Sequence, residues 1–589
     1  MEKTGKIYGI NGPVIYIKGK TDFIMGEMVY VSEERLVGEV ISLTTKMTTI
    51  QVYEDTMGLK PGDMVYGTNQ ALFVTLAPGI LHNIFDGIER PLKSIAEDSN
   101  SVYINRGISV DALDKNKKWD TTMQVKVGDT VFPGTVIAHV PETKSIIHKV
   151  MVPPGTVGVV SEIKEDGAYT IDEEIVVLTL DDGTKKSLTM TQIWPIRVPR
   201  PVNARQSVTK PLVTGQRILD TLFPIAKGGT ACVPGGFGTG KTMTQHQIAK
   251  WSDADIIVYI GCGERGNEMT QVLEDFSKLP DPKTGNTLMD RTTLIANTSN
   301  MPVAAREASI YTGITLAEYY RDMGYHVAIM ADSTSRWAEA LRELSGRLEE
   351  MPAEEGFPAY MASKLSAFYE RAGYFENLNG TEGSVSIIGA VSPQGGDFSE
   401  PVTQNTKRFV RCFWGLDKSL AYARHFPAIH WLTSYSEYAG DLTKWYEDYV
   451  GEDFVKCRNK ILAILNTESN LQEIVKLIGQ DVLPDDQKLT LEIAKVIRLG
   501  FLQQNAFHKD DTCVPLKKQL KMMQIILYLY EKCKELIGMN MPMSILKSED
   551  IFERIIAIKY DVPNDKLKMF ADYKIAIDNF YNKIMETNA

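Results

Sequence analysis

A glycine-rich stretch near the middle of the chain has the residue types and spacing that bind phosphate. The segment reads GGFGTGKT from Gly235 to Thr242 and matches G-x-x-x-x-G-K-[ST]. Glycines let backbone N–H groups point at phosphate oxygens, and the helix expected to follow adds partial positive charge. We expect Lys241 to reach the β- and γ-phosphates of a nucleotide and Thr242 to place its hydroxyl on Mg²⁺. The other loop residues predicted to bind nucleotide are Gly235, Gly236, Phe237, Gly238, Thr239 and Gly240.

Two acidic residues elsewhere could complete this chemistry. Asp332 ends the apolar stretch HVAIMAD, and ligands of open α/β sheets bind at the carboxyl ends of strands. Asp332 is therefore the predicted second magnesium ligand, although an Asp that caps the next segment would look the same. Glu264 follows the apolar stretch ADIIVYIG, and a carboxylate there can orient or deprotonate water. Taken alone, Glu264 fits a surface charge cluster equally well.

The segments around these residues predict the elements that hold them. Apolar strands alternate with longer amphipathic segments from about 191 to 437, which is typical of an α/β domain with a parallel sheet. Residues 1–72 alternate in short strands separated by turns, which favours a small β-barrel. Residues 115–190 form a second strand-rich block with PG, PPG, EDG and DDG turns. From 438 onward apolar residues repeat at three and four, as in helices.

Composition narrows the class of protein. A chain of 589 residues needs about three or four domains. Its 64 Lys+Arg against 75 Asp+Glu argue against a nucleic-acid partner, which would require basic surface. The six cysteines form no C-x-x-C pair, which disfavours a zinc site or a disulfide framework and suits a reducing cytosol. No run approaches the roughly 18–20 apolar residues of a membrane helix.

Three segments together resemble the catalytic A subunit of V-type and archaeal-type rotary ATPases. They are GGFGTGKT, GCGERGNEM and ADSTSRWAEALRELSGRLEEMPAEEGFPAY, and the match continues through ARHFPAIHWLTSYSEY and LPDDQKLTLEIAKVIRLGFLQQNAF. The block at 115–190 looks like the insertion that distinguishes A subunits from the β subunit of F-type ATP synthases. The resemblance implies a multidomain protein with an N-terminal β-barrel (1–72), an α/β P-loop (RecA-like) nucleotide-binding domain (73–114 and 191–437) with a β-rich insertion (115–190), and a C-terminal α-helical domain (438–589).

The resemblance also assigns roles to side chains. It implies that Glu264 polarises the attacking water and that Arg265 belongs to a nucleotide-sensing network, so the catalytic set is Lys241, Glu264 and Arg265. Phe426 in HFPAI and Phe507 in QQNAF correspond to aromatic residues that clamp adenine, and stacking suits a flat base. For either Phe alone, core packing is the more frequent role. Arg336 is expected near the same site.

The partners follow from the same resemblance. It implies a ring of three A and three B subunits, with the B subunit supplying an arginine finger in trans. ATP hydrolysis to ADP and phosphate, with Mg²⁺, would turn a central shaft held against peripheral stalk subunits. The shaft would drive H⁺ or Na⁺ transport in a membrane rotor sector, or ATP synthesis in reverse. The chain would then be cytoplasmic and peripheral on the membrane, with no nucleic acid bound.

Some residues depart from the family pattern, and two other functions compete with it. Gly236 stands where the family loop has proline, so we expect altered nucleotide affinity or product release. Leu499-Gly500 stands where relatives carry charged residues.

One competing function is that of a noncatalytic paralog like the B subunit, which needs neither Lys241 nor Glu264. The other is a hexameric RNA translocase or an export ATPase, which the acidic balance and the insertion oppose.

Overall fold

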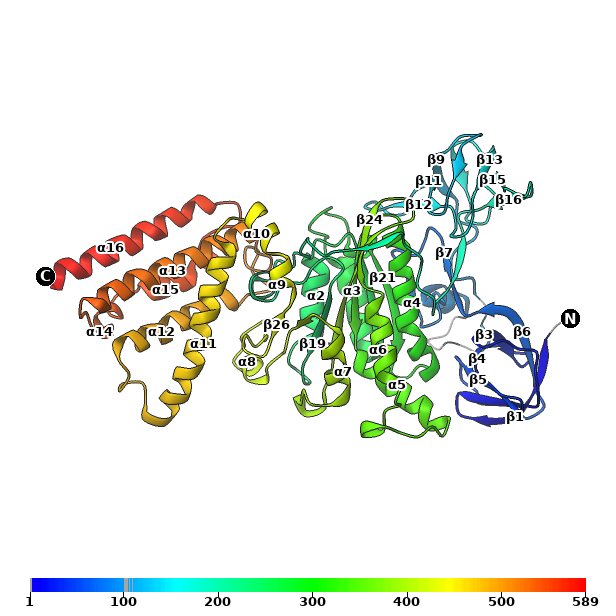
Figure 1. The fold of residues 1–589 in the computed structure, drawn as a ribbon, viewed down its shortest axis with the longest axis horizontal. Coiled ribbons are helices and arrows are strands. Elements are labelled where there is room, and N and C mark those ends of the chain that lie inside the picture. Colours follow the sequence, from blue (N-terminus) through cyan, green and yellow to red (C-terminus); the bar gives the residue numbers. More distant parts are fainter. Residues whose placement is uncertain (1–2, 100–103, 105, 109, 589) are drawn as a thin grey trace.

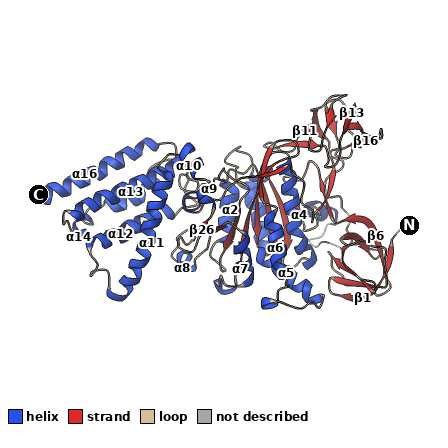
Figure 2. Ribbon diagram, viewed as in Figure 1, coloured by secondary structure: helices blue, strands red, loops and turns tan. Residues whose placement is uncertain are grey.

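The chain forms an elongated molecule with the N-terminal strands at one end and the C-terminal helices at the other (Figure 1). The computed structural model describes residues 3–99, 104, 106–108 and 110–588. The outer limits of the predicted first and last domains, residues 1 and 589, lie outside these residues. Strands dominate one end, helices the other, and a mixed layer lies between them (Figure 2). The predicted fold class is thereby confirmed.

The N-terminal strands close into an antiparallel barrel in the order β1-β2-β5-β4-β3-β6. Their bounds are β1 (Thr4–Asn11), β2 (Val14–Lys18), β3 (Glu27–Val31), β4 (Leu36–Leu43), β5 (Met47–Val52) and β6 (Met64–Ala71). Alternate side chains such as Ile15, Val29 and Ile50 point inward and form a core of their own. Closure leaves no open sheet edge.

The β-rich insertion consists of two four-stranded sheets, ordered β10-β13-β15-β16 and β12-β11-β9-β14. The strands are β9 (Trp119–Met123), β10 (Thr130–Val131), β11 (Val136–Pro141), β12 (Ile147–Met151), β13 (Gly158–Ile163), β14 (Gly167–Tyr169), β15 (Val176–Thr179) and β16 (Lys185–Leu188). The chain leaves the insertion through β17 (Gln192–Pro195), which pairs with β7 (Phe73–Leu76).

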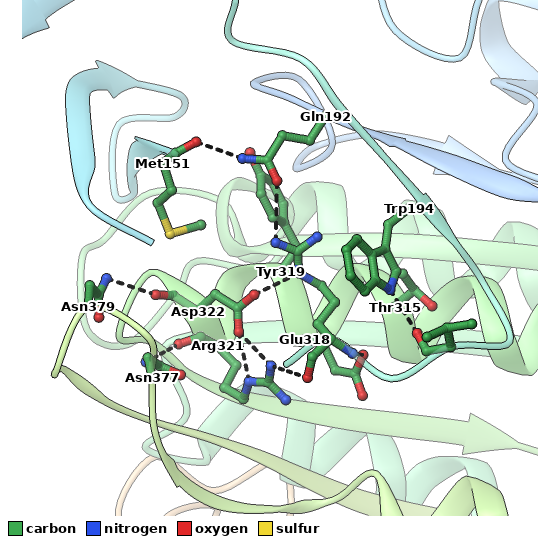
Figure 3. A network of polar contacts seen from close by, with 12 residues as sticks. Met151, Gln192, Trp194, Thr315, Glu318, Tyr319, Arg321, Asp322, Asn377 and Asn379 are labelled. Carbon is green, nitrogen blue, oxygen red and sulfur yellow. Dashed lines mark hydrogen bonds and ion pairs between the residues drawn. The ribbon is translucent and has the colours of Figure 1, made fainter. Parts of the chain in front are cut away.

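A polar network fastens the insertion to the end of α4 (Val303–Asp322), as Figure 3 shows. Gln192 Nε2 donates to the Met151 carbonyl at 2.7 Å, and Arg200 Nε donates to Asp322 at 2.6 Å. Asn379 Nδ2 donates to the Asp322 carbonyl at 3.2 Å. Arg200 Nη2 also donates to Gln192 Oε1 at 3.4 Å, so these contacts form a chain from Met151 in the insertion to Asp322 at the end of α4.

A ten-stranded sheet forms the centre of the molecule, and its main path runs β26-β25-β19-β24-β22-β20-β21-β8. The strands are β8 (Ile84–Phe85), β18 (Ala204–Gln206), β19 (Thr230–Pro234), β20 (Ile256–Glu264), β21 (Thr292–Thr298), β22 (His326–Asp332), β23 (Gly373–Glu376), β24 (Glu382–Val391), β25 (Cys412–Phe413) and β26 (Tyr435–Ser436). The six strands from β19 to β8 are parallel neighbours. Their carboxyl ends therefore meet at one edge.

Helices cover both faces of this sheet. They are α2 (Lys241–Trp251), α3 (Gly266–Lys278), α4, α5 (Thr334–Arg347), α6 (Met361–Glu370) and α7 (Pro401–Phe409). Two shorter helices are α1 (Leu92–Ser99) and α8 (Lys418–Tyr422). Successive residues of β20 alternate between the faces: Ile257 and Tyr259 join the core with α2 and α3, and Val258 and Ile260 join the core with α4 and α5. Short helical turns are η1 (Ile218–Leu222), η2 (Leu288–Arg291), η3 (Glu354–Gly356) and η4 (Gln394–Gly396).

The C-terminal part is helical and shares a continuous core with the face of the sheet under α2 and α3. Its helices are α9 (Tyr438–Asp441), α10 (Thr443–Tyr449), α11 (Phe454–Ile478), α12 (Asp485–Val496), η5 (Ile497–Leu502), α13 (Leu516–Gly538), α14 (Met543–Leu546), α15 (Ile551–Asp561), η6 (Leu567–Met569) and α16 (Phe570–Asn588).

Close helix packing explains the unusual Leu499-Gly500 pair. A Cβ on Gly500 would lie 3.1 Å from Ile556 Cα, so a larger residue would require α15 to shift slightly away from η5. The approach brings Lys559 Nζ to 2.7 Å from the Leu499 carbonyl, and this bond ties the two helices together.

Candidate active site

The glycine-rich loop connects β19 to α2, as a phosphate loop requires. Thr239 donates its backbone N–H at 3.4 Å and its hydroxyl at 2.8 Å to the Gly236 carbonyl, which folds the loop into a turn. Lys241 Nζ donates to the Gly235 carbonyl at 3.1 Å, so its ammonium lies against the loop. Burial lowers the pKa of Lys241, while the charge of Asp332 opposes this shift.

The two predicted magnesium ligands lie in contact. Thr242, in the first turn of α2, donates its hydroxyl to Asp332 Oδ2 at 2.8 Å, and Asp332 is buried at the end of β22. Within the described residues, no group of three His, Cys, Asp or Glu side chains could hold a metal. One carboxylate and one hydroxyl fit Mg²⁺ nonetheless, because this ion keeps water ligands and takes phosphate oxygens from its substrate.

Glu264 reaches the same edge because β20 lies beside β22. The register pairs Gly261 with Asp332, and the chain turns at Gly263, whose φ is 71°. A Cβ on Gly263 would lie 2.7 Å from Arg336 Cβ, so this turn needs glycine. Burial, the nearby charge of Asp332 and a hydrogen bond with Glu268 raise the pKa of Glu264 to about 8. A carboxyl group with a pKa near the working pH can take a proton from water.

The two arginines of the prediction, Arg265 and Arg336, lie near the loop and near Glu264 respectively. Arg265 occupies the position before α3, and its guanidinium lies 5.6 Å from the centre of the Phe237 ring. Arg336 on α5 donates to Glu339 at 2.8 Å, and its charge partly offsets the raised pKa of Glu264. The structure therefore places Arg336 near Glu264, but its guanidinium forms an ion pair with Glu339 of the same helix.

Phe426 and Phe507 line one cavity beside the phosphate loop, with a volume of about 380 Å³. Its other walls include Gly240, Met243 and Thr244 at the start of α2. Phe507 is 94% exposed and Phe426 is 45% exposed, so neither ring packs in the core. The more frequent role of a phenylalanine, core packing, is therefore not the role of either one.

A buried arginine joins the segments that carry these rings. Arg217 forms an ion pair with Asp511, and its backbone N–H donates to Gln504 Oε1 at 2.9 Å. Gln504 N–H in turn donates to the Phe426 carbonyl at 2.7 Å. These contacts fix the segment before Phe507 against the segment of Phe426, so the two rings reach one cavity from different parts of the chain.

Sequence reasoning overlooked several residues of the site. Glu268 lies in the first turn of α3, and because Glu264 belongs to β20, no helical spacing in the sequence connects the two residues. Gln503, Asn505 and Tyr560 also line the cavity, and no local pattern marks them. Tyr259 occupies a buried position of β20, and nothing in the local sequence indicates that its hydroxyl contacts Asp332.

Four sequence families match the chain in order. Residues 7–69 match the ATP synthase alpha/beta family, beta-barrel domain; residues 110–197 the ATPsynthase alpha/beta subunit barrel-sandwich domain; residues 215–436 the ATP synthase alpha/beta family, nucleotide-binding domain; and residues 443–542 the C-terminal domain of V and A type ATP synthase. The V-type ATP synthase alpha chain of Halothermothrix orenii is 59% identical over 587 residues, which cover 100% of this chain and 99% of that relative.

The chain belongs to the A-subunit (alpha-chain) family of V- and A-type ATP synthases. Two further members are similar along almost all of their length: V-type ATP synthase alpha chain 2 of Clostridium tetani and the A subunit of the A-type ATP synthase of Methanopyrus kandleri. They are 60% and 54% identical, each match covering 99% of this chain and 98% of the relative. This A-family chain is thus the catalytic subunit of a rotary ATP synthase or ATPase coupled to ion translocation.

A solved structure of another ATPase shares the fold of this A-family chain. The assembled ATPase EscN of the enteropathogenic E. coli type III secretion system matches with a TM-score of 0.62, over 89% of this chain and 100% of that chain, at 20% identity. At that identity the likeness shows the fold alone. The full-length A-family relatives exclude the export ATPase, the RNA translocase and the noncatalytic paralog.

Among the described residues, each helix is too short or too polar to cross a membrane.

Proposed function

We propose that this chain converts ATP and ADP at the carboxyl edge of its central sheet, with Mg²⁺ held by Thr242 and Asp332. The observation that carries the proposal is the 2.8 Å contact between these two side chains, at the edge where β20 ends in Glu264. Mg²⁺, when bound, would neutralise charge on the phosphate oxygens. Lys241 would bind those oxygens, and Glu264 would orient or deprotonate the attacking water.

The residues around this centre complete the nucleotide site. Arg265 and Arg336 would sense the charge of the γ-phosphate, because the Arg265 guanidinium lies near Phe237 of the loop and the charge of Arg336 acts on Glu264. Phe426 and Phe507 would hold adenine between exposed rings, since stacking on an aromatic face suits a flat base. The loop residues assigned to the phosphates are Gly235, Gly236, Phe237, Gly238, Thr239 and Gly240.

The exposed ring of Phe507 gives a direct test of the adenine site. Phe507→Ala should weaken ADP binding about 5–10-fold, because loss of base stacking costs on the order of 1 kcal/mol. Calorimetric titration of the full chain with ADP measures this. Binding of tripolyphosphate, which has no base, should not change.

Tyr422→Ala is the matched control, because Tyr422 is 85% exposed and does not line the cavity. It should bind ADP as the unaltered chain does. An equal loss of ADP and tripolyphosphate binding in Phe507→Ala would contradict a specific role in holding the base.

Gly236 gives a second test, because a larger residue there meets Lys418. A Cβ on Gly236 would lie 2.7 Å from Lys418 Cε, and Lys418 Nζ donates to the Gly395 carbonyl at 2.8 Å. Gly236→Pro combined with Lys418→Ala should tighten ADP binding about 2–5-fold, since proline removes about 0.4–1 kcal/mol of backbone freedom. Gly236→Pro alone should gain less, because Lys418 must move.

A double-mutant cycle over these two positions, read by ADP calorimetry, measures the coupling. Lys418→Ala alone is the control and should bind ADP within about twofold of the unaltered chain. Additive effects of the two substitutions would show that Lys418 does not limit the loop.

The partners and the location are part of the same proposal. We infer a ring of three A and three B subunits, with an arginine of B completing each site, and attachment through shaft and stalk subunits to a membrane rotor sector. This places the chain in the cytoplasm, peripheral on the membrane. Co-purification with its neighbouring subunits, followed by ATPase assays with and without Na⁺, tests the assembly and separates Na⁺ from H⁺ transport.

A further inference from the structure

The tyrosine at position 259 lies beneath the candidate active site, on the face of the sheet that α2 and α3 cover. Its ring packs at 5.7 Å from the His246 ring of α2 and at 5.9 Å from the Phe276 ring of α3, both edge-on. The side chain is almost fully buried. These contacts fix the position of the tyrosine hydroxyl relative to both helices, because each of the three rings packs against the other two.

The hydroxyl of Tyr259 donates to Asp332 Oδ2 at 3.3 Å. This is the same oxygen that accepts the Thr242 hydroxyl at 2.8 Å. In the part of the chain that the structure describes, both side-chain donors to this carboxylate therefore reach one oxygen, one from β20 and one from α2. Two donors on a single oxygen restrict the rotation of the carboxylate and leave Oδ1 without a side-chain donor among the described residues.

We propose that Tyr259 is the positioning residue for Asp332, and that it sets how strongly Mg²⁺ enhances nucleotide binding. The inference rests on the proposed role of Asp332 as a magnesium ligand. Groups that orient a metal ligand change metal affinity by about 10–100-fold when they are removed. Mg²⁺ requires near-ideal octahedral geometry, so it is sensitive to the orientation of its one protein carboxylate. Tyr259 itself touches neither the nucleotide nor the metal in this assignment.

Tyr259→Phe isolates the hydroxyl, because the phenylalanine ring keeps the packing against His246 and Phe276. The full chain is titrated calorimetrically with ADP, first with a chelator and then with Mg²⁺. We expect unchanged affinity for metal-free ADP, which also shows that the variant is folded. The gain in affinity on adding Mg²⁺ should fall about 10-fold or more.

Two reference variants separate the possible causes. Tyr446→Phe also removes a buried hydroxyl, which donates to the Asp220 carbonyl at 2.8 Å away from the site, and it should leave both affinities unchanged. Asp332→Ala should abolish the Mg²⁺ gain.

If Asp332→Ala loses the gain while Tyr259→Phe keeps it, the role of Tyr259 is overturned and the proposed metal site stands. If Asp332→Ala keeps the gain, the metal site itself is wrong. Equal weakening of metal-free and Mg²⁺-bound ADP in Tyr259→Phe would show a general structural effect and would also overturn the inference.

Discussion

Adding the B subunit to this chain should raise its rate of ATP hydrolysis by about 10³–10⁵, the typical effect of an arginine finger. That factor corresponds to roughly 4–7 kcal/mol of transition-state stabilisation. The structure gives the reason: Arg336 is already paired with Glu339, and Arg265 is exposed beside Phe237. In the proposed ring, an arginine of the B subunit would add the positive charge that offsets the charge developing on the transferred phosphoryl group.

Phosphate release at saturating Mg²⁺-ATP, by the chain alone and with purified B subunit, measures this effect. ADP binding by the chain alone serves as the control, because it shows that the nucleotide site is folded without its partner. Full turnover by the isolated chain would contradict the shared site and, with it, the proposed ring.

Glu264→Gln should lower turnover in the assembled ring by about 10²–10⁴, the usual contribution of a general base. Glutamine keeps the size of the side chain and can still form a hydrogen bond to water, but it cannot accept the proton. ATP binding should persist, because Lys241, Thr242 and Asp332 are unchanged. Steady-state hydrolysis and equilibrium ATP binding on the same preparation separate the two quantities.

Glu274→Gln is a matched control on α3. Glu274 is exposed and pairs with Lys278 at 3.0 Å, so its loss should leave turnover within about twofold. Unchanged turnover in Glu264→Gln would instead favour a site that binds nucleotide without hydrolysing it.

Glu264→Gln should also change how the stability of the nucleotide-free chain depends on pH. The pKa of Glu264 in the folded chain is about 8, above its ordinary value of 4.5, so its contribution to stability is fully present below pH 4.5 and is lost as pH rises through 8. Glutamine has no ionisable group, so the variant does not lose this stability as the pH rises. Glu264→Gln should therefore melt about 2–4 °C higher than the unaltered chain at pH 8.5 and no higher at pH 4.5. A shift of equal size at both pH values would exclude the charge of Glu264 as its cause.

The features that were predictable from the sequence are those encoded by neighbouring residues. The loop GGFGTGKT, the strands ending in Glu264 and Asp332, and the change to helical periodicity after 438 depend on spacings of a few residues. Glycine spacing and periods of 2 and 3.6 are local properties of the chain, so they are visible before folding. The family resemblance added roles for Phe426 and Phe507 that their local patterns do not carry.

The sequence by itself thus determined the order of the elements, the phosphate loop and the family. Only the tertiary structure decided which side chains meet. Thr242 contacts Asp332 across 90 positions of the chain, Tyr259 reaches that same carboxylate, and the cavity at Phe507 depends on Arg217. The reason is physical: these contacts depend on strand order, on register and on which face a residue occupies. Those quantities are set when distant segments pack together, because burial of the shared core selects one arrangement among those that the local patterns allow.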